Sequence, residues 1–197
     1  MKALKIIGIV IGSIVLLVVI IFGVIWFMIS RPSKIANEVT TVANNEQAAQ
    51  ALDTKWDDFK AEVAQAPVGK VVTITMTEEQ VNSKINEGLK TTDLPSGMTI
   101  GKMNVNLLDG KILLSATIQY SVLTGNAGMS ATVDLVDGQP TITVTEIDMG
   151  SLPIPQSIKD QLRNLIPKDA LFQTDASFQA QSIVIADHVL TITGIKK

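Results

Sequence analysis

Residues 103–122, MNVNLLDGKILLSATIQYSV, decide the fold class of this chain. Apolar and polar residues alternate on both sides of Asp109-Gly110, a pair that supplies the positive φ angles of a two-residue hairpin turn. A second such pair, Asp137-Gly138, ends the next alternating run. Because each strand has one apolar and one polar face, the pattern predicts an antiparallel sheet with one face in water.

Shorter signals extend the hairpin pattern in both directions. Alternation at 71–76 predicts an earlier strand, and Gly125-Asn126-Ala127-Gly128 predicts a turn. A register slip is expected near Glu146, where the alternation changes phase. Residues 183–195 predict a closing hairpin with its turn at Asp187-His188.

Three amphipathic helices are expected beside the strands. A heptad stripe, strongest between Gln47 and Val63, predicts the first. Thr77-Glu78-Glu79-Gln80 is a capping box that starts the second, which runs to about Leu89. The third covers about 156–166.

The heptad stripe of the first helix has two interpretations. Its positions are Ile35, Val42, Ala49, Trp56 and Val63, joined by Val39, Leu52 and Phe59. It can pack on its own domain or form a membrane-proximal coiled coil. Because Glu38, Asn45 and Glu46 interrupt the stripe, packing on the domain is favoured.

An apolar run at 6–29 holds no charged residue. At about 1.5 Å per residue, a helix of this length crosses the roughly 30 Å hydrocarbon layer of a bilayer. The run is also far longer than the apolar region of about 7–15 residues in a cleaved signal peptide. We therefore expect a transmembrane signal-anchor at 1–30, in the cell membrane, with a cytoplasmic N-terminus.

The expected fold is α+β: this N-terminal transmembrane helix, followed by a strongly curved antiparallel β-meander packed against two or three amphipathic helices. The chain is expected to divide into the single-pass anchor at 1–30, a membrane-proximal linker or helix at 31–46, and an extracytoplasmic domain at 47–197.

Few side chains of this chain suit catalysis. Cysteine is absent, and His188 is the single histidine and lies where a hairpin turn is expected. The adjacent pairs Asp57-Asp58 and Glu78-Glu79 fit a solvated helix face and a helix start. We therefore expect no enzyme, no catalytic residue, no cofactor and no metal site.

Charge excludes another class of partner. The net charge is −3, and both arginines, Arg31 and Arg163, are isolated. Nucleic acid is therefore not an expected partner.

The apolar face of the predicted sheet is the remaining candidate for function. Such a face normally forms a solid core, but aliphatic side chains in a chain with 4 % aromatic residues would also suit an acyl chain. Periodicity does not decide between a core and a groove. The residues expected to line a lipid groove are Val81, Ile85, Leu89, Leu114, Ile118, Tyr120, Val133, Ile142, Val144, Ile158 and Leu162.

Several motifs resemble one family. The strand that runs into Thr77-Glu78-Glu79-Gln80-Val81-Asn82 is similar to a signature of small single-pass envelope proteins of the YpmS type and of their LmeA-like relatives. Val136-Asp137-Gly138, the segment 147–155 and the closing hairpin at 182–194 fit as well, although Asp187-His188 stands where such proteins often have Asp-Gly. The resemblance covers most of the chain after about Ala48.

This resemblance implies an elongated, tubular lipid-binding (TULIP-like) architecture, in which a rolled sheet and a long helix hold acyl chains. It carries over no catalytic residue, and Asn82 is expected to fix the corner between helix and strand. The implied protein is bacterial and membrane-anchored, and it binds membrane lipid non-covalently in a hydrophobic groove, in envelope lipid handling.

Two other functions are kept open. A non-enzymatic scaffold of a cell-envelope complex would bind an envelope protein partner through the helix from Ile35 to Val63. A hydrolase acting on envelope lipid or glycan would need Asp and Glu side chains that converge in a pocket.

Overall fold

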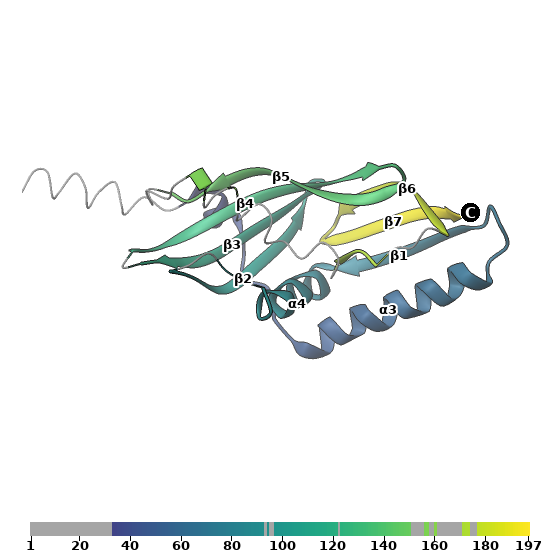
Figure 1. Ribbon diagram of the computed structural model, residues 1–197, viewed down its shortest axis with the longest axis horizontal. Helices are drawn as coiled ribbons and strands as arrows, with labels where there is room; N and C mark the ends of the chain where they lie inside the picture. Colours follow the sequence, from purple (N-terminus) through teal and green to yellow (C-terminus); the bar gives the residue numbers. More distant parts are fainter. Residues whose placement is uncertain are drawn as a thin grey trace, which may run out of the picture.

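The computed structural model describes residues 33–92, 94, 97–121, 123–150, 156–157, 160, 171–173 and 177–197. This part of the chain forms an elongated α+β body in which two antiparallel sheets follow one another along the long axis (Figure 1). The two longer helices lie next to each other along one side of this body.

One sheet has four strands in the order β2-β3-β4-β5. The strands are β2 (Met98–Leu108), β3 (Lys111–Tyr120), β4 (Leu123–Val136) and β5 (Gln139–Asp148). The two predicted Asp-Gly turns are confirmed: Asp109 and Asp137 have φ angles of 48° and 53°, and the glycine that follows each is also at positive φ.

The other sheet has three strands in the order β1-β7-β6. They are β1 (Val71–Thr77), β6 (Phe178–Ala186) and β7 (Val189–Lys196). Alternate residues of β1 are buried and exposed, as predicted. The closing hairpin is confirmed too, and its turn residues Asp187 and His188 have φ angles of 51° and 61°.

The prediction of one continuous curved meander is wrong, because the strands divide into two sheets. The turns of the four-stranded sheet meet β6 end-on. Gly110 N–H donates to the Ile185 carbonyl at 3.2 Å, and Ala180 N–H donates to the Gly138 carbonyl at 3.0 Å. The β2–β3 and β4–β5 hairpins therefore end at β6 and do not pair with it as further strands of its sheet.

The predicted turn at 125–128 is also wrong, because these residues lie inside β4. The chain reverses earlier, after Tyr120, where Ser121 adopts a φ of 55°. The glycine at 128 serves close packing: a Cβ placed there would lie 2.6 Å from the Ile35 Cβ and 2.5 Å from the Ala36 nitrogen.

The helices whose bounds lie within the described residues are α2 (Lys34–Glu38), α3 (Glu46–Gln65) and α4 (Glu78–Leu89). The predicted capping box of α4 is present. The apolar stripe of α3 is buried against its own domain, where α3 contacts β1 and α4. This burial confirms the packing interpretation of the heptad stripe over the coiled coil.

No helix among the described residues is both long and apolar enough to cross a membrane. The 20-residue α3 has sufficient length, but charged residues such as Asp57 and Asp58 occupy its exposed face. This finding contradicts the predicted transmembrane helix, whose residues 1–30 lie outside the described part. The predicted signal-anchor, single-pass topology and membrane localisation all depended on that helix, so the same finding contradicts them.

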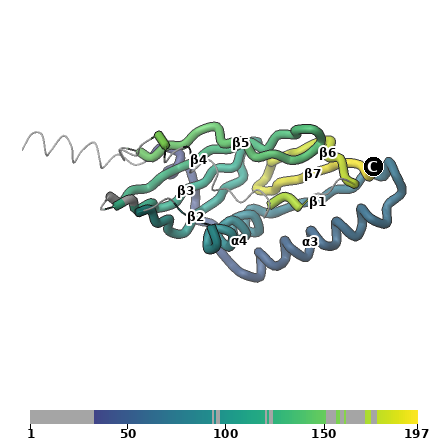
Figure 2. The backbone as a smooth tube through the Cα atoms, viewed as in Figure 1, coloured from purple at the N-terminus to yellow at the C-terminus, as the bar shows by residue number. Residues whose placement is uncertain are grey.

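Residues 33–45, which we call the strap, cross the outer face of the four-stranded sheet (Figure 2). The strap begins at β5, where the Asp148 carboxylate accepts from Lys34 N–H at 2.6 Å. It reaches the other edge of the sheet at β2, where Asn106 Oδ1 accepts from Thr40 N–H at 2.6 Å. The strap therefore covers the outer face and leaves the inner face to the core.

The main core fills the space between the two sheets, α3 and α4. A second, smaller apolar cluster lies on the same inner face of the four-stranded sheet; it consists of Met98, Ile118, Ala127 and Met149, with Ile100, Met129 and Ile147 packed against it. Met129 contacts both clusters. The candidate site lies where these two clusters meet.

Candidate functional site

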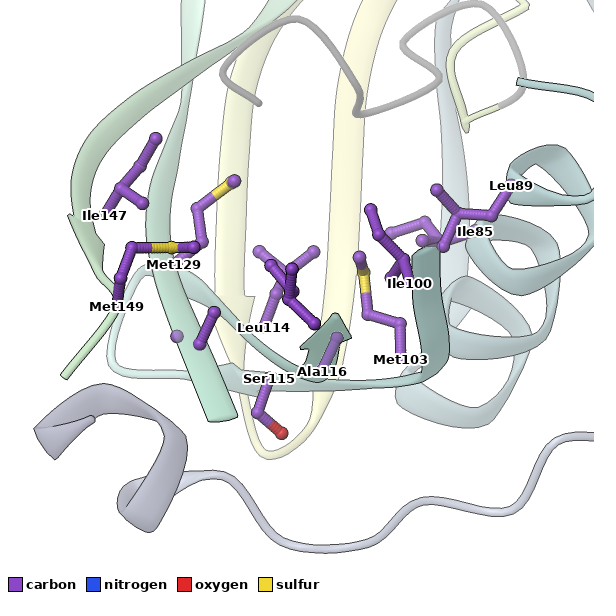
Figure 3. A pocket seen from close by; sticks show the side chains of 13 residues that line it. Ile85, Leu89, Ile100, Met103, Leu114, Ser115, Ala116, Met129, Ile147 and Met149 are labelled. Carbon is purple, nitrogen blue, oxygen red and sulfur yellow. The ribbon is translucent and has the colours of Figure 1, made fainter. Parts of the chain in front are cut away.

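An apolar pocket lies between α4 and the inner face of the four-stranded sheet (Figure 3). Its open space measures about 40 Å³. The described residues that line it are Ile85, Leu89, Ile100, Met103, Leu114, Ser115, Ala116, Ile118, Ala127, Gly128, Met129, Ile147 and Met149. In Figure 3 the hydroxyl of Ser115 points away from the pocket, so the surface that a ligand would meet is hydrocarbon and thioether.

A β-bulge on edge strand β2 shapes one wall of the pocket. Ile100 pairs with Ile118 and Met103 pairs with Ala116, so two residues of β2 oppose Thr117 alone. In a regular strand, side chains three residues apart point to opposite faces. The extra residue brings Ile100 and Met103 to the same face, and both line the pocket.

A second bulge, on the opposite edge strand β5, shapes the facing wall. Ser130 pairs with Glu146 and Ala131 pairs with Val144, which leaves Thr145 as the extra residue. The register slip predicted near Glu146 is thereby confirmed. Because of this bulge, the odd-numbered Ile147 shares the inner face with the even-numbered Val144, and it lines the pocket with Met149.

The wall formed by α4 is fixed to β2 by a ladder of side-chain hydrogen bonds. Glu78, Asn82 and Asn86 accept from the N–H groups of Leu107, Val105 and Met103 at 2.7, 3.1 and 3.0 Å. Four helical residues rise about 6.0 Å and two strand residues about 6.7 Å, so the two spacings match. The ladder satisfies the open edge of β2 and holds Ile85 and Leu89 over the sheet.

The predicted groove residues divide into three groups in the structure. Ile85, Leu89, Leu114 and Ile118 line the pocket. Val81, Val133, Ile142 and Val144 belong to or pack against the main core instead. Tyr120 ends β3, and Ile158 and Leu162 lie outside the described residues.

Sequence reasoning missed the methionine side of the pocket: Met103, Met129 and Met149. The bulges shift the phase of both edge strands and so bring Ile100 and Ile147 to the same face as these methionines. One signal was available: Gly101 lies between two apolar residues three positions apart, and glycine inside a strand often marks a bulge.

The expected structural role of Asn82 is borne out. Its side chain is fully buried, and its amide donates to the Ala43 carbonyl at 2.9 Å while its oxygen accepts from Val105. The roles of Glu78 and Asn86 were missed. Polar residues at 78, 82 and 86, four apart on one helix face, were the signal for a helix that covers a strand edge.

His188 lies in a turn, as predicted, but it also has a partner that its sequence neighbourhood does not reveal. Its Nδ1 is 2.9 Å from Glu78 Oε2, the same oxygen that accepts from Leu107. The hydrogen bond and the negative charge of Glu78 raise the pKa of His188 above its ordinary value. This pair joins the turn between β6 and β7 to the start of α4.

Carboxylates do not gather into a metal site: within the described residues, no three His, Cys, Asp or Glu side chains could hold a metal ion. Glu79 accepts from the Asn45 amide at 3.1 Å, and Asp57 lies on the exposed face of α3. The expectations of no enzyme and no cofactor remain predictions.

No family model and no curated protein matches this chain. The resemblance to YpmS-type and LmeA-like proteins therefore also remains a prediction.

Proposed function

We propose that this protein binds a single acyl chain of a lipid non-covalently in the pocket between α4 and the four-stranded sheet. The observation that carries the proposal is the chemistry of the pocket wall. Its described side chains are aliphatic or thioether apart from Ser115, which points away. Such a wall offers no group that would recognise a polar substrate and suits a ligand of hydrocarbon.

Methionine explains how a chain longer than the open space can enter. The 40 Å³ present admits only a few atoms, so a ligand must displace side chains. Met103 and Met129 are unbranched and partly buried, and their three rotatable bonds let them move without backbone change. Each methylene that replaces them contributes about 0.8 kcal/mol on leaving water.

The rest of the pocket is rigid, which favours one defined binding position. The side-chain ladder of α4 holds one wall, and the bulged strands β2 and β5 form the others. The alternative scaffold function would need an accessible stripe on α3, and its central residues Trp56 and Phe59 are 0 % and 5 % exposed. We therefore do not propose that alternative.

The test uses the full chain and an uncharged fluorescent probe, the methyl ester of dansyl-undecanoic acid. Fluorescence titration should show saturable binding with one site. Ile100→Trp places a large ring at the pocket wall and should weaken binding about tenfold or more, which corresponds to roughly 1.4 kcal/mol. The matched control is Thr99→Trp, since Thr99 is the exposed neighbour of Ile100 on the same strand.

Mass spectrometry of an organic extract of the purified chain should in addition identify a copurified lipid. Equal binding by both tryptophan variants, or no saturable binding by the wild-type chain, would overturn the proposal.

A further inference from the structure

A depression lined by both polar and apolar residues adjoins the apolar pocket, and the two share Leu89 and Ile100. Its volume is about 280 Å³, and we call it the mouth. The other described residues around it are Asn44, Asn86, Lys90, Gly101 and Lys102. Two of these side chains are positively charged and none is negatively charged, in a chain whose net charge is −3.

We propose that the mouth binds the anionic headgroup of the same amphiphile whose acyl chain occupies the pocket. The inference rests on the proposed function and adds the class of ligand: a single-chain amphiphile with a carboxylate or phosphate head. Leu89 and Ile100 would contact the first methylenes of the chain, because they line both the mouth and the pocket.

Lys102 reaches the mouth because of the bulge in β2. It lines both the mouth and a depression on the outer face of the sheet, so it lies at the edge between the two faces. Within the described part of the chain, no carboxylate forms an ion pair with it. Its ammonium group is therefore available to an anion.

Lys90 lies on the opposite side of the mouth, directly after the end of α4. It forms an ion pair with Glu46 at 3.9 Å, and because the two side chains are 66 % and 88 % exposed, this pair is weak and an anion in the mouth can compete with it. A lysine is favoured at a helix C-terminus because it interacts with the helix dipole, which explains why Lys90 is found there. This effect does not explain the presence of Lys102, which lies on a strand.

The end of α4 does not present its negative dipole freely to the mouth. Lys90 N–H donates to the Glu87 carbonyl at 3.1 Å, and Thr91 N–H donates to the Gly88 carbonyl at 3.2 Å. The Thr92 hydroxyl donates to the same glycine carbonyl at 2.8 Å. With these acceptors occupied, Lys90 and Lys102 are the charged side chains among the described residues that line the mouth.

The experiment compares dansyl-undecanoic acid with its methyl ester on the full chain, since the ester lacks the negative charge and adds only one methyl group. The acid should bind more tightly than the ester, and the difference should shrink at high salt. Lys102→Gln and Lys90→Gln should each weaken binding of the acid about fivefold, as expected for one exposed charge pair. Neither variant should change binding of the ester.

Lys111→Gln is the matched control, because it removes the same charge from an exposed residue at the far end of the β2–β3 hairpin. If this control weakens binding of the acid as much as the mouth variants, the effect is general charge and the inference fails. If acid and ester bind equally, the headgroup inference fails while the proposed function stands. If neither probe binds, the proposed function itself fails.

Discussion

The side-chain oxygen of Asn82 on α4 accepts a hydrogen bond from the backbone N–H of Val105 on β2 at 3.1 Å, and both residues are fully buried. The Asn82 amide also donates to the Ala43 carbonyl of the strap. One side chain thus joins the helix, the strand edge and the strap, which are the three parts that hold the pocket wall in place.

Replacement of Asn82 by alanine should therefore destabilise the fold strongly. The N–H of Val105 would lose its partner in the interior, where an unsatisfied group costs about 1–3 kcal/mol, and the Ala43 carbonyl would lose a hydrogen bond. We expect a loss of about 2–4 kcal/mol in the free energy of unfolding, measured by urea denaturation. Asn126→Ala, at an exposed position on β4, should change stability by less than about 0.5 kcal/mol.

The Glu78–His188 pair should make stability depend on pH. Because Glu78 raises the pKa of His188, the stabilisation is complete below the unfolded-state pKa of about 6.5 and is lost as the pH rises through the higher folded-state value. NMR titration of His188 should give a pKa above that of a free histidine. In Glu78→Gln the pKa should fall back; an unchanged value would show that the carboxylate is not the cause.

His188→Asn is a suitable second variant for the same pair, since asparagine tolerates the positive φ of 61° at this turn. The melting temperature of the wild-type chain should exceed that of the variant more at low pH than at high pH. A constant difference across the titration range would mean that the turn, and not the charge, determines the effect.

Gly128 packs so closely against the strap that we expect no side chain, not even a methyl group, to fit at this position without a shift of the strap. In Gly128→Ala, the new Cβ would overlap Ile35 and Ala36, and the strap must move away from β4. We expect a loss of about 1–3 kcal/mol in denaturation experiments. Gly101→Ala is the control, because a Cβ at that position would lie 3.4 Å from its nearest neighbour, the Thr117 carbonyl oxygen.

The α3 stripe should behave as core in mutagenesis. Trp56 is fully buried and its ring lies 5.5 Å from that of Phe59, in an edge-to-face arrangement. Trp56→Ala should cost about 3–5 kcal/mol. A fully folded, unchanged protein carrying this substitution would contradict the packing of α3 described above.

Trp56→Phe should cost much less, for a reason specific to this site. The indole Nε1 is buried and has no hydrogen-bond partner among the described residues. The smaller ring leaves a cavity, but it also removes an unsatisfied donor worth about 1–3 kcal/mol. Thermal denaturation of the two variants side by side should show this ordering.

Local signals in the sequence predicted most of the secondary structure. Asp109-Gly110 and Asp137-Gly138 form the expected turns because the conformation of a two-residue turn depends mainly on its own residues. The capping box of α4 was predictable for the same reason, since Thr77 and Gln80 satisfy each other within one helical turn.

The pocket was only half predictable. Ile85, Leu89, Leu114 and Ile118 follow from periodicity, but Ile100 and Ile147 do not, because the bulges that bring them to the inner face with Met103 and Val144 arise where strands pair. Secondary-structure propensity and alternation depend on a residue and its neighbours in sequence. They contain no information on which residue of another strand stands opposite.

By itself, the sequence determined the two Asp-Gly turns, the closing hairpin and the start of α4, because these depend on side chains within a few residues of one another. Only the tertiary structure decided that the strands form two sheets, that Glu78, Asn82 and Asn86 cover the edge of β2, and that Lys90 and Lys102 meet beside one pocket. Such relationships join segments far apart in the chain, and they are selected by the packing of the whole molecule.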